Sequence, residues 1–299
     1  MLTAGELIHS WNSFFFNPVP VYSLALFRII FGLVLLCDAV YNLMNIKEYL
    51  GPQGLIGFDR YKGRSGYAFS LFRLFPPTLG SAYAIVFIHI FFLLFLILGL
   101  LTQLSTFFVF LTLCSIVNRN PTICNGGDNV SRVMCFLLIF APSGEVYSLD
   151  NLIFPSGPGT STIYFQPWAV RLMQVQLSII YIYTAYWKLK GATYRNGTAL
   201  YYVVKNDLYK RFSVPEIVVR RPFVQVLTWG VLALEFALGF GLWVEDVRVP
   251  LLIGGFLLHL SIEYLLNVHF FSWYMMAALL LFIDPLTVDK YVTLLLSLA

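Results

Sequence analysis

The segment 79–101 contains no Asp, Glu, Lys or Arg, and it is long enough to cross a membrane as one helix. A spanning helix needs about 20 mostly apolar residues. Similar apolar segments recur along the whole chain, whose 299 residues are 59% hydrophobic and 11% charged. Soluble domains carry roughly 25% charged residues. We therefore expect an integral, multi-pass membrane protein.

The apolar segments predict an all-α bundle of about eight transmembrane helices, joined by short loops and short interfacial helices. Residues 1–299 are expected to form a single membrane domain, because little of the chain is left outside the spans. The expected spans are 21–44, 79–101, 104–117, 129–141, 167–189, 223–244, 250–266 and 270–285. Residues 5–20 and 191–221 are predicted to lie along the membrane surface.

The basic residues are distributed unevenly between the loops. With eight spans, the loops after spans one, three and five carry 13 of the 19 Lys and Arg residues, whereas the opposite side carries two. The positive-inside rule then places these basic loops in the cytoplasm and both termini outside. A basic vestibule kept for function would give the same asymmetry. Nucleic-acid binding is not expected, because the basic residues lie in short membrane-flanking loops.

The fifth expected span carries polar side chains at alternating three- and four-residue steps. They are Arg171, Gln174, Ser178, Tyr181 and Lys188, with Ala185 filling the remaining step. On an α-helix this spacing places them on one face. A charge at the bilayer centre costs at least ~2.5–3.5 kcal/mol, so this face is expected to point into the protein or a wet cavity.

Other polar residues are expected at a similar depth, on the side of the membrane that carries the basic loops. If the spans alternate in direction, this side holds the end of span five, the start of span four and the end of span seven. The polar groups there are Asp38, Asp128, Arg132, His259, Glu263, Asn267 and His269. We expect these groups, which come from four helices with Lys188, to line one polar vestibule.

Several of these residues also have a structural interpretation. Lys188 could extend its ammonium to the membrane surface from a helix end, and Asp128 could cap the fourth span. His259 and Glu263 are four residues apart and could bond each other across one turn. Structural pairs inside the bundle are expected for three more residues, Arg28, Arg171 and Glu235. No metal site is predicted, because no second carboxylate–histidine motif accompanies the first.

A lysine at this depth indicates acid–base chemistry. A low-dielectric environment disfavours an ammonium ion, so such a lysine can lose its proton and serve as a general base near neutral pH. A base at the edge of an apolar cavity suits an amphiphilic substrate with an acidic hydroxyl. A reduced quinone has these properties, because its tail dissolves in lipid while its phenolic hydroxyl reaches polar groups.

Three parts of the chain resemble vitamin K-dependent γ-glutamyl carboxylase and its bacterial relatives, the horizontally transferred transmembrane (HTTM) domain proteins. Residues 181–189 (YIYTAYWKL) with 194–197 (YRNG) resemble the segment that bears the catalytic lysine of the carboxylase. Residues 119–121 (RNP), 125–128 (NGGD) and 148–150 (SLD) are similar to the bacterial members. Residues 259–272 resemble the late histidine-bearing helix of the carboxylase.

The resemblance implies an enzyme in which Lys188 deprotonates a reduced quinone, either vitamin K hydroquinone or menaquinol, and His259 supports it. Asp128 is the ionisable group in the segment where the carboxylase has a histidine. We expect the cofactor to contact the neighbouring polar side chains Gln174, Ser178, Tyr181, Glu263 and His269. CO2 and O2 are the co-substrates that the resemblance implies, and a peptide, protein or small molecule is the expected substrate.

The bacterial relatives place the expected protein in the bacterial inner membrane, with lipid and a lipid-soluble quinone as partners. The alternative function is a non-catalytic membrane partner for the maturation or export of a secreted peptide, or for immunity to it. That alternative predicts a tight peptide or protein partner and tolerance of changes at Lys188 and Asp128.

Overall fold

The computed structural model describes residues 3–58, 69–155 and 162–298 of the chain. Its described residues are helical apart from one short pairing of two strands and an isolated bridge, which confirms the expected all-α class. The helices divide into two compact units. The first unit comprises residues 1–173 and 284–299, and the second comprises residues 174–283.

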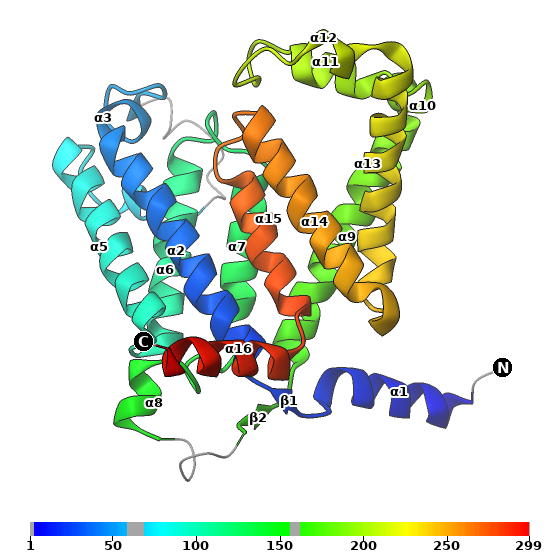
Figure 1. The fold of residues 1–299 in the computed structure, drawn as a ribbon. Coiled ribbons are helices and arrows are strands. Elements are labelled where there is room, and N and C mark those ends of the chain that lie inside the picture. The colour runs from blue at the N-terminus through cyan, green and yellow to red at the C-terminus, as the bar shows by residue number, and fades with distance from the viewer. Residues whose placement is uncertain (1–2, 59–68, 156–161, 299) are drawn as a thin grey trace. The chain divides into compact units, whose positions relative to one another are not determined.

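Neighbouring long helices form the centre of the first unit, where α2 packs against α5, α5 against α6, and α6 against α7 (Figure 1). These helices are α2 (Tyr22–Met44), α5 (Leu79–Leu98), α6 (Thr102–Arg119) and α7 (Gly126–Leu138). The remaining elements are α1 (Ala4–Phe16), α3 (Ile46–Tyr49), η1 (Leu71–Arg73), α8 (Leu149–Ile153) and α16 (Pro285–Ser297). Strand β1 (Val19–Pro20) pairs antiparallel with β2 (Tyr164–Phe165).

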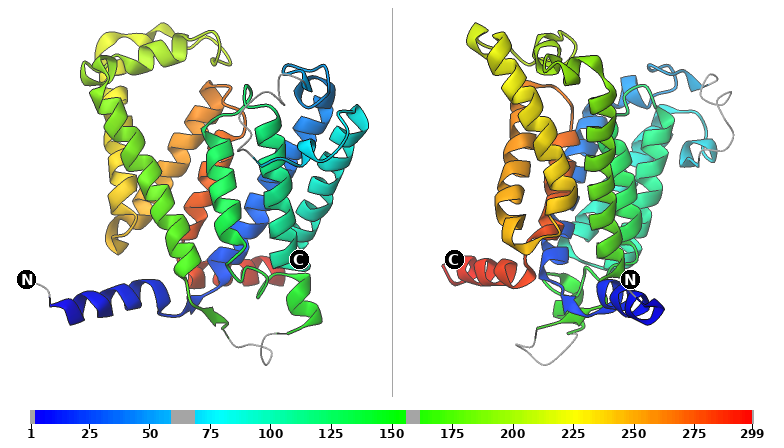
Figure 2. Two further views of the ribbon diagram at one scale, coloured as in Figure 1. Left: turned by 180° about the vertical axis from the view of Figure 1, so that it is seen from behind. Right: turned by 90° about the vertical axis from the view of Figure 1, so that its right-hand side faces the viewer.

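The second unit is built on the helix that carries the polar face. This helix, α9 (Trp168–Lys190), begins in the first unit and continues into the second. Two long helices and a shorter one follow, α13 (Arg221–Gly241), α14 (Glu245–Leu265) and α15 (Phe271–Leu279), with η2 (Leu280–Phe282). The short helices α10 (Ala192–Arg195), α11 (Ala199–Lys205) and α12 (Glu216–Val219) fold over one end of α13 (Figure 2).

Among the described residues, four helices are long and apolar enough to cross a membrane by themselves: α2, α5, α13 and α14. A fifth candidate is the pair Phe271–Phe282 and Pro285–Ser297, which is bent by 106° at its break. These helices make the chain a multi-pass integral membrane protein. The expected spans at 104–117, 129–141 and 167–189 correspond to α6, α7 and α9, which are not among these candidates.

Residues next to α5 and α6 determine where α5 begins and ends and where α6 begins. Thr78 caps α5, because its hydroxyl accepts the N–H of Ser81, and α5 ends at Gly99 in the left-handed region at φ +68°. A Cβ on Gly99 would lie 2.7 Å from Arg28 and 2.4 Å from Ser148, so the tight turn into α6 needs glycine. Asp150 then binds the first N–H groups of α6, at Leu101 and Thr102.

Candidate functional site

The polar face of α9 lies inside the second unit, and each of its polar side chains from residue 174 onward has a partner. Gln174, Ser178 and Tyr181 are buried. Gln174 Nε2 donates to the carbonyl oxygen of Leu281 at 2.7 Å, and Trp243 Nε1 donates to Ser178 Oγ at 2.9 Å. The polar side chains on this face of α9 therefore bond to residues of the elements that follow α9 in the chain.

Lys188 forms a salt bridge with Glu235 of α13. The Lys188 side chain is 28% exposed and that of Glu235 is 8% exposed, so the lysine is the more exposed member of the pair. One carboxylate oxygen of Glu235, Oε1, accepts from the lysine, whereas the buried Oε2 has no hydrogen-bond partner among the described residues. A buried acceptor left unpaired is destabilising, and it can bind an added donor.

Close packing of α9 on α13 brings this pair together. A Cβ on Gly239 would lie 2.5 Å from Ile182 Cγ1, so the two helices approach at this glycine. Glu235 lies one turn before Gly239, and Lys188 lies six residues beyond Ile182 on α9. Since the two helices run antiparallel here, both side chains lie on the same side of the crossing.

Tyr181 and His259 form a second buried pair, between α9 and α14. The Tyr181 hydroxyl oxygen and His259 Nε2 are 2.8 Å apart. His259 Nδ1 is buried without a hydrogen-bond partner among the described residues. Tyr181 and Lys188 are seven residues apart, so the two pairs lie two turns apart on one helix, at a rise of about 10.5 Å.

Tyr194, in the segment that reads YRNG, lies beside the lysine. The Lys188 ammonium is 5.8 Å from the centre of the Tyr194 ring, within range of a cation–π contact. Burial raises the pKa of Tyr194 above its ordinary value, and the charge of Glu235 raises it further. The phenol therefore stays neutral beside the ion pair. This arrangement depends on Gly197, whose φ is +74° and whose Cβ would meet Gln225.

Glu263 and His269 lie beyond the Tyr181–His259 pair, where α14 ends. Glu263 pairs with Arg211, so the alternative in which His259 and Glu263 bond each other does not hold: each residue has its partner on another segment. Arg211 also donates from its backbone N–H to Leu265 and from Nε to the carbonyl of Leu266. His269 lies in the turn before α15, at φ 55°, with its ring against Phe270.

Asp128 and Asp38 belong to the first unit. The helix cap of α7 is Asn125 rather than Asp128, whose Oδ2 accepts the backbone N–H of Asn125 at 2.6 Å from the third helical position. Asp38 Oδ1 accepts from Asn42 at 2.9 Å. The vestibule predicted to join these residues with Lys188 and His259 stays a prediction.

Two of the expected structural residues have partners in the first unit. Arg171 donates from Nε to the carbonyl of Phe14 at 3.2 Å, so it serves the packing of α1 rather than the site. The buried Arg28 donates to the carbonyl oxygens of Ser143 and Tyr147. Glu235, the third of this group, is instead the partner of Lys188. Its signal in the sequence was a lone acid within an apolar segment.

The pairs Lys188–Glu235 and Tyr181–His259 bring together side chains that can exchange protons, and most of these side chains are buried. Lysine, carboxylate, imidazole and phenol can each give or take a proton, and they occur here as two side-chain pairs in one unit. Among the described residues, no group of three or more His, Cys, Asp or Glu side chains is placed to hold a metal ion. The arrangement is suited to proton transfer with a ligand that reaches Lys188.

Comparison with known proteins identifies a family that matches most of the chain and relatives that match parts of it. The HTTM domain matches residues 16–286. The chain is 25% identical over 176 residues to "Uncharacterized protein YitO" of Bacillus subtilis (strain 168). The matched region covers 55% of each chain. It is 22% identical over 189 residues to the sporulation-delaying protein SdpB of the same strain, covering 58% of this chain and 55% of SdpB.

The chain thus spans about half the length of the curated relatives it matches. No solved structure matches it. The HTTM match covers both structural units and extends from the end of α1 to the beginning of α16. The chain therefore belongs to the HTTM domain family.

Proposed function

We propose that this protein is a membrane enzyme in which Lys188 takes a proton from the hydroxyl of a lipid-soluble, quinol-type cofactor. The observation that carries the proposal is the Lys188–Glu235 pair, in which the lysine is accessible and the carboxylate is buried with one oxygen unpaired. Such a pair can present a base to a ligand on one side while the carboxylate accepts the proton of the ammonium on the other.

The residues fit one end of a reduced quinone. Lys188 Nζ would accept the proton of a phenolic hydroxyl, and Glu235 Oε2 is an acceptor that a bound hydroxyl could fill. The exposed rings of Tyr183, Tyr186 and Trp187 continue along α9 and offer apolar surface to a ring or an isoprenoid tail. When bound, a reduced quinone would supply the acidic hydroxyl and the electrons, with O2 and CO2 as the co-substrates that the family resemblance implies.

Proton movement in this proposal uses the chain's own atoms. Transfer of a proton from Lys188 Nζ to Glu235 Oε1 converts the ion pair into a neutral amine and a neutral carboxyl. The neutral amine then accepts the hydroxyl proton. Tyr181 and His259 hold the adjacent part of α9 against α14, and His259 Nδ1 remains as a further polar contact for the ligand.

The test uses the full chain in lipid nanodiscs, with Lys190→Gln as the matched control for Lys188→Gln. Lys190 is on the same helix but stacks on Tyr186 and Trp187. The wild-type protein should copurify with a quinone, seen by mass spectrometry, and should take up O2 when menaquinol is added. Loss of a general base lowers the rate about 10²–10⁴-fold, so Lys188→Gln should retain quinone but lose this uptake.

Two results would contradict the proposal: wild-type protein that binds no quinone, or a Lys188→Gln variant with the O2 uptake of the wild type. Lys190→Gln should keep its rate. A second function, supported by the similarity to the sporulation-delaying protein SdpB, is a non-catalytic membrane partner of a secreted peptide. Copurification of a peptide instead of a quinone would favour that function.

The proposal includes an eight-span topology, in which α6, α7, α9 and the pair α15–η2 cross the membrane beside α2, α5, α13 and α14. The 18 residues of α6 and the 23 residues of α9 support it, as does the uneven distribution of basic residues between the loops. Reporter fusions after Leu101 and Asn120 should give opposite locations, with Asn120 in the cytoplasm. The same location for both would exclude a crossing by α6.

A further inference from the structure

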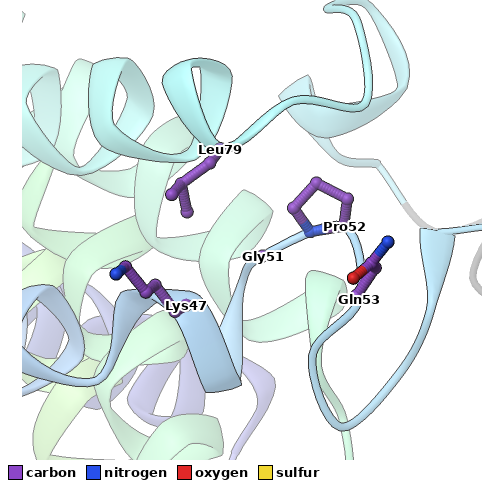
Figure 3. A pocket seen from close by; sticks show the side chains of 5 residues that line it. All are labelled: Lys47, Gly51, Pro52, Gln53 and Leu79. Atoms are coloured by element: carbon purple, nitrogen blue, oxygen red, sulfur yellow. The ribbon is translucent and has the colours of Figure 1, made fainter.

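A cavity of about 380 Å³ lies in the first unit, where α3 and the loop after it meet the beginning of α5. Its lining residues are Lys47, Gly51, Pro52, Gln53 and Leu79. Figure 3 shows Lys47 and Leu79 on one side and Pro52 and Gln53 on the other. The volume is in the range of small-ligand pockets, roughly 300–1,000 Å³. None of these residues belongs to the Lys188 site.

Two cations lie at or near the cavity, and one of them, Lys47, has no partner among the described residues. The Lys47 ammonium has no hydrogen bond or ion pair among the described residues, and its side chain is exposed. Beneath the floor, the fully buried Arg119 donates from NH2 to the carbonyl of Gly51 at 2.7 Å and from NH1 to that of Ile56 at 2.9 Å. A ligand in the cavity would therefore meet one accessible cation and a second positive charge behind the backbone.

The cavity lies at the ends of two spanning helices, at the level of the lipid headgroups. It adjoins Leu79, the first residue of the spanning helix α5, and Lys47, three residues after the last residue of the spanning helix α2. Both helices end there, at the level where an apolar segment gives way to polar loops. Phosphate groups of lipids occupy this level of a membrane, and each nearby Lys or Arg attracts an anionic lipid.

An apolar ridge leads from the cavity along α5. Leu79, Tyr83, Phe87 and Phe91 follow at steps of four residues, which places them along one side of the helix. The Tyr83 and Phe87 rings stack at 6.0 Å, and Phe87 and Phe91 are exposed. Only 33% of the most apolar 18-residue stretch of α5 is buried. The surface thus offers a charged headgroup site and an acyl-chain site in continuity.

We propose that this cavity binds the phosphate-bearing headgroup of an anionic glycerophospholipid, with an acyl chain along the Tyr83–Phe91 ridge of α5. Lys47 pairs with the phosphate, and Gln53 offers an amide to the headgroup hydroxyls. This site is separate from the proposed quinol site and does not depend on it. Free glycerol phosphate shares the phosphate chemistry but lacks the chain that the ridge would hold.

Native mass spectrometry of the full chain in detergent, titrated with phosphatidylglycerol or phosphatidylcholine, tests the proposal. Lys47→Gln should weaken phosphatidylglycerol binding about fivefold and remove the preference over phosphatidylcholine, since one Lys near a membrane surface contributes that much. Lys47→Arg should keep the preference. Lys290→Gln, which removes an exposed lysine of α16 in the same unit, should also keep it.

A second variant, Leu79→Trp, fills the cavity and leaves the charge in place, so it should weaken phosphatidylglycerol binding as well. The proposal is overturned if Lys47→Gln binds phosphatidylglycerol as the wild type does. It is also overturned if sn-glycerol 3-phosphate alone displaces the lipid at equal concentration, because the ligand would then be a free phosphate compound. Circular dichroism of each variant verifies that the fold is retained.

Discussion

The buried arginines of the first unit and the Lys188 and His259 side chains of the second unit have different kinds of partner. In the first unit, the guanidinium groups of Arg28 and Arg119 donate to backbone carbonyls of loops. In the second unit, Lys188 and His259 bond to side chains, Glu235 and Tyr181. Arginine keeps its proton and a carbonyl cannot take one, whereas each group of the second set can exchange a proton. The first arrangement fixes loops, and the second can carry chemistry.

The largest effect is expected where a guanidinium clamps a loop. Arg28→Met keeps much of the volume but leaves the carbonyls of Ser143 and Tyr147 without their charged donor. We expect the free energy of unfolding to fall by about 2–4 kcal/mol. Thermal unfolding in detergent, followed by tryptophan fluorescence, measures it. An unchanged unfolding midpoint would show that the Arg28 hydrogen bonds do not stabilise the first unit. The proposed difference between the two units would then not hold.

The second-largest effect is expected for the interaction between Lys188 and Glu235 in the second unit. In a double-mutant cycle with Lys188→Met and Glu235→Gln, we expect a coupling of about 1–3 kcal/mol in unfolding, because both residues depend on one contact. The matched pair Lys210–Asp207, whose acid is exposed, should show no measurable coupling. Additive effects at Lys188 and Glu235 would mean that the pair does not persist in solution.

A smaller loss is expected at the tyrosine–histidine pair. Tyr181→Phe keeps the ring and removes the hydroxyl that bonds His259 Nε2 at 2.8 Å. The buried imidazole then lacks a partner on both nitrogens, so stability should fall by about 1–2 kcal/mol. Tyr183→Phe, at an exposed position of the same helix, should stay within about 0.5 kcal/mol. Equal unfolding midpoints for the two variants would contradict the buried bond.

The smallest effect concerns a titratable group that is bound to backbone, Asp150. Burial favours its neutral form, but hydrogen bonds from Thr102 and Leu101, with the charge of Arg28, outweigh this and hold its pKa below the ordinary value. A lowered pKa in the folded state means that the ionised carboxyl stabilises the fold above about pH 4, and that this contribution is lost as the pH falls further.

We therefore expect Asp150→Asn to destabilise the protein by about 0.5–1.5 kcal/mol at pH 7, as removal of a helix cap does. The difference from the wild type should shrink below about pH 4. Unfolding midpoints of both proteins between pH 7 and pH 3 measure this. A difference that is constant across the range would show that the carboxylate charge is not what binds the start of α6.

The sequence predicted the helices well because most of them are long apolar segments bounded by Pro, Gly or polar residues. The expected span 21–44 corresponds to α2, and 167–189 to α9. The polar face of α9 followed from spacing within one helix. Its partners did not, because contacts such as Lys188–Glu235 and Ser178–Trp243 depend on how separate helices pack.

Local spacing was not enough to choose between alternatives where a partner from another segment was better placed. His259 and Glu263 are one turn apart, yet Tyr181 and Arg211 bind them. Asp128 follows two glycines and was a reasonable cap, but the side chain of Asn125 precedes it and fills that role. An i, i+4 spacing shows that two side chains of one helix can reach each other. It does not show whether a residue of another segment binds one of them instead.

The segment over the end of α13 is fastened at two separate places. Gly197 and Asn196 lie against Gln225 of α13, while the backbone of Lys210 pairs with Leu266 at the end of α14. Because the entropy of loop closure grows only with the logarithm of loop length, residues added between these anchors would cost little. A single deletion within 206–210 would instead shift the Lys210–Leu266 register and release Glu263 from Arg211. The connection is thus tolerant of lengthening and intolerant of shortening.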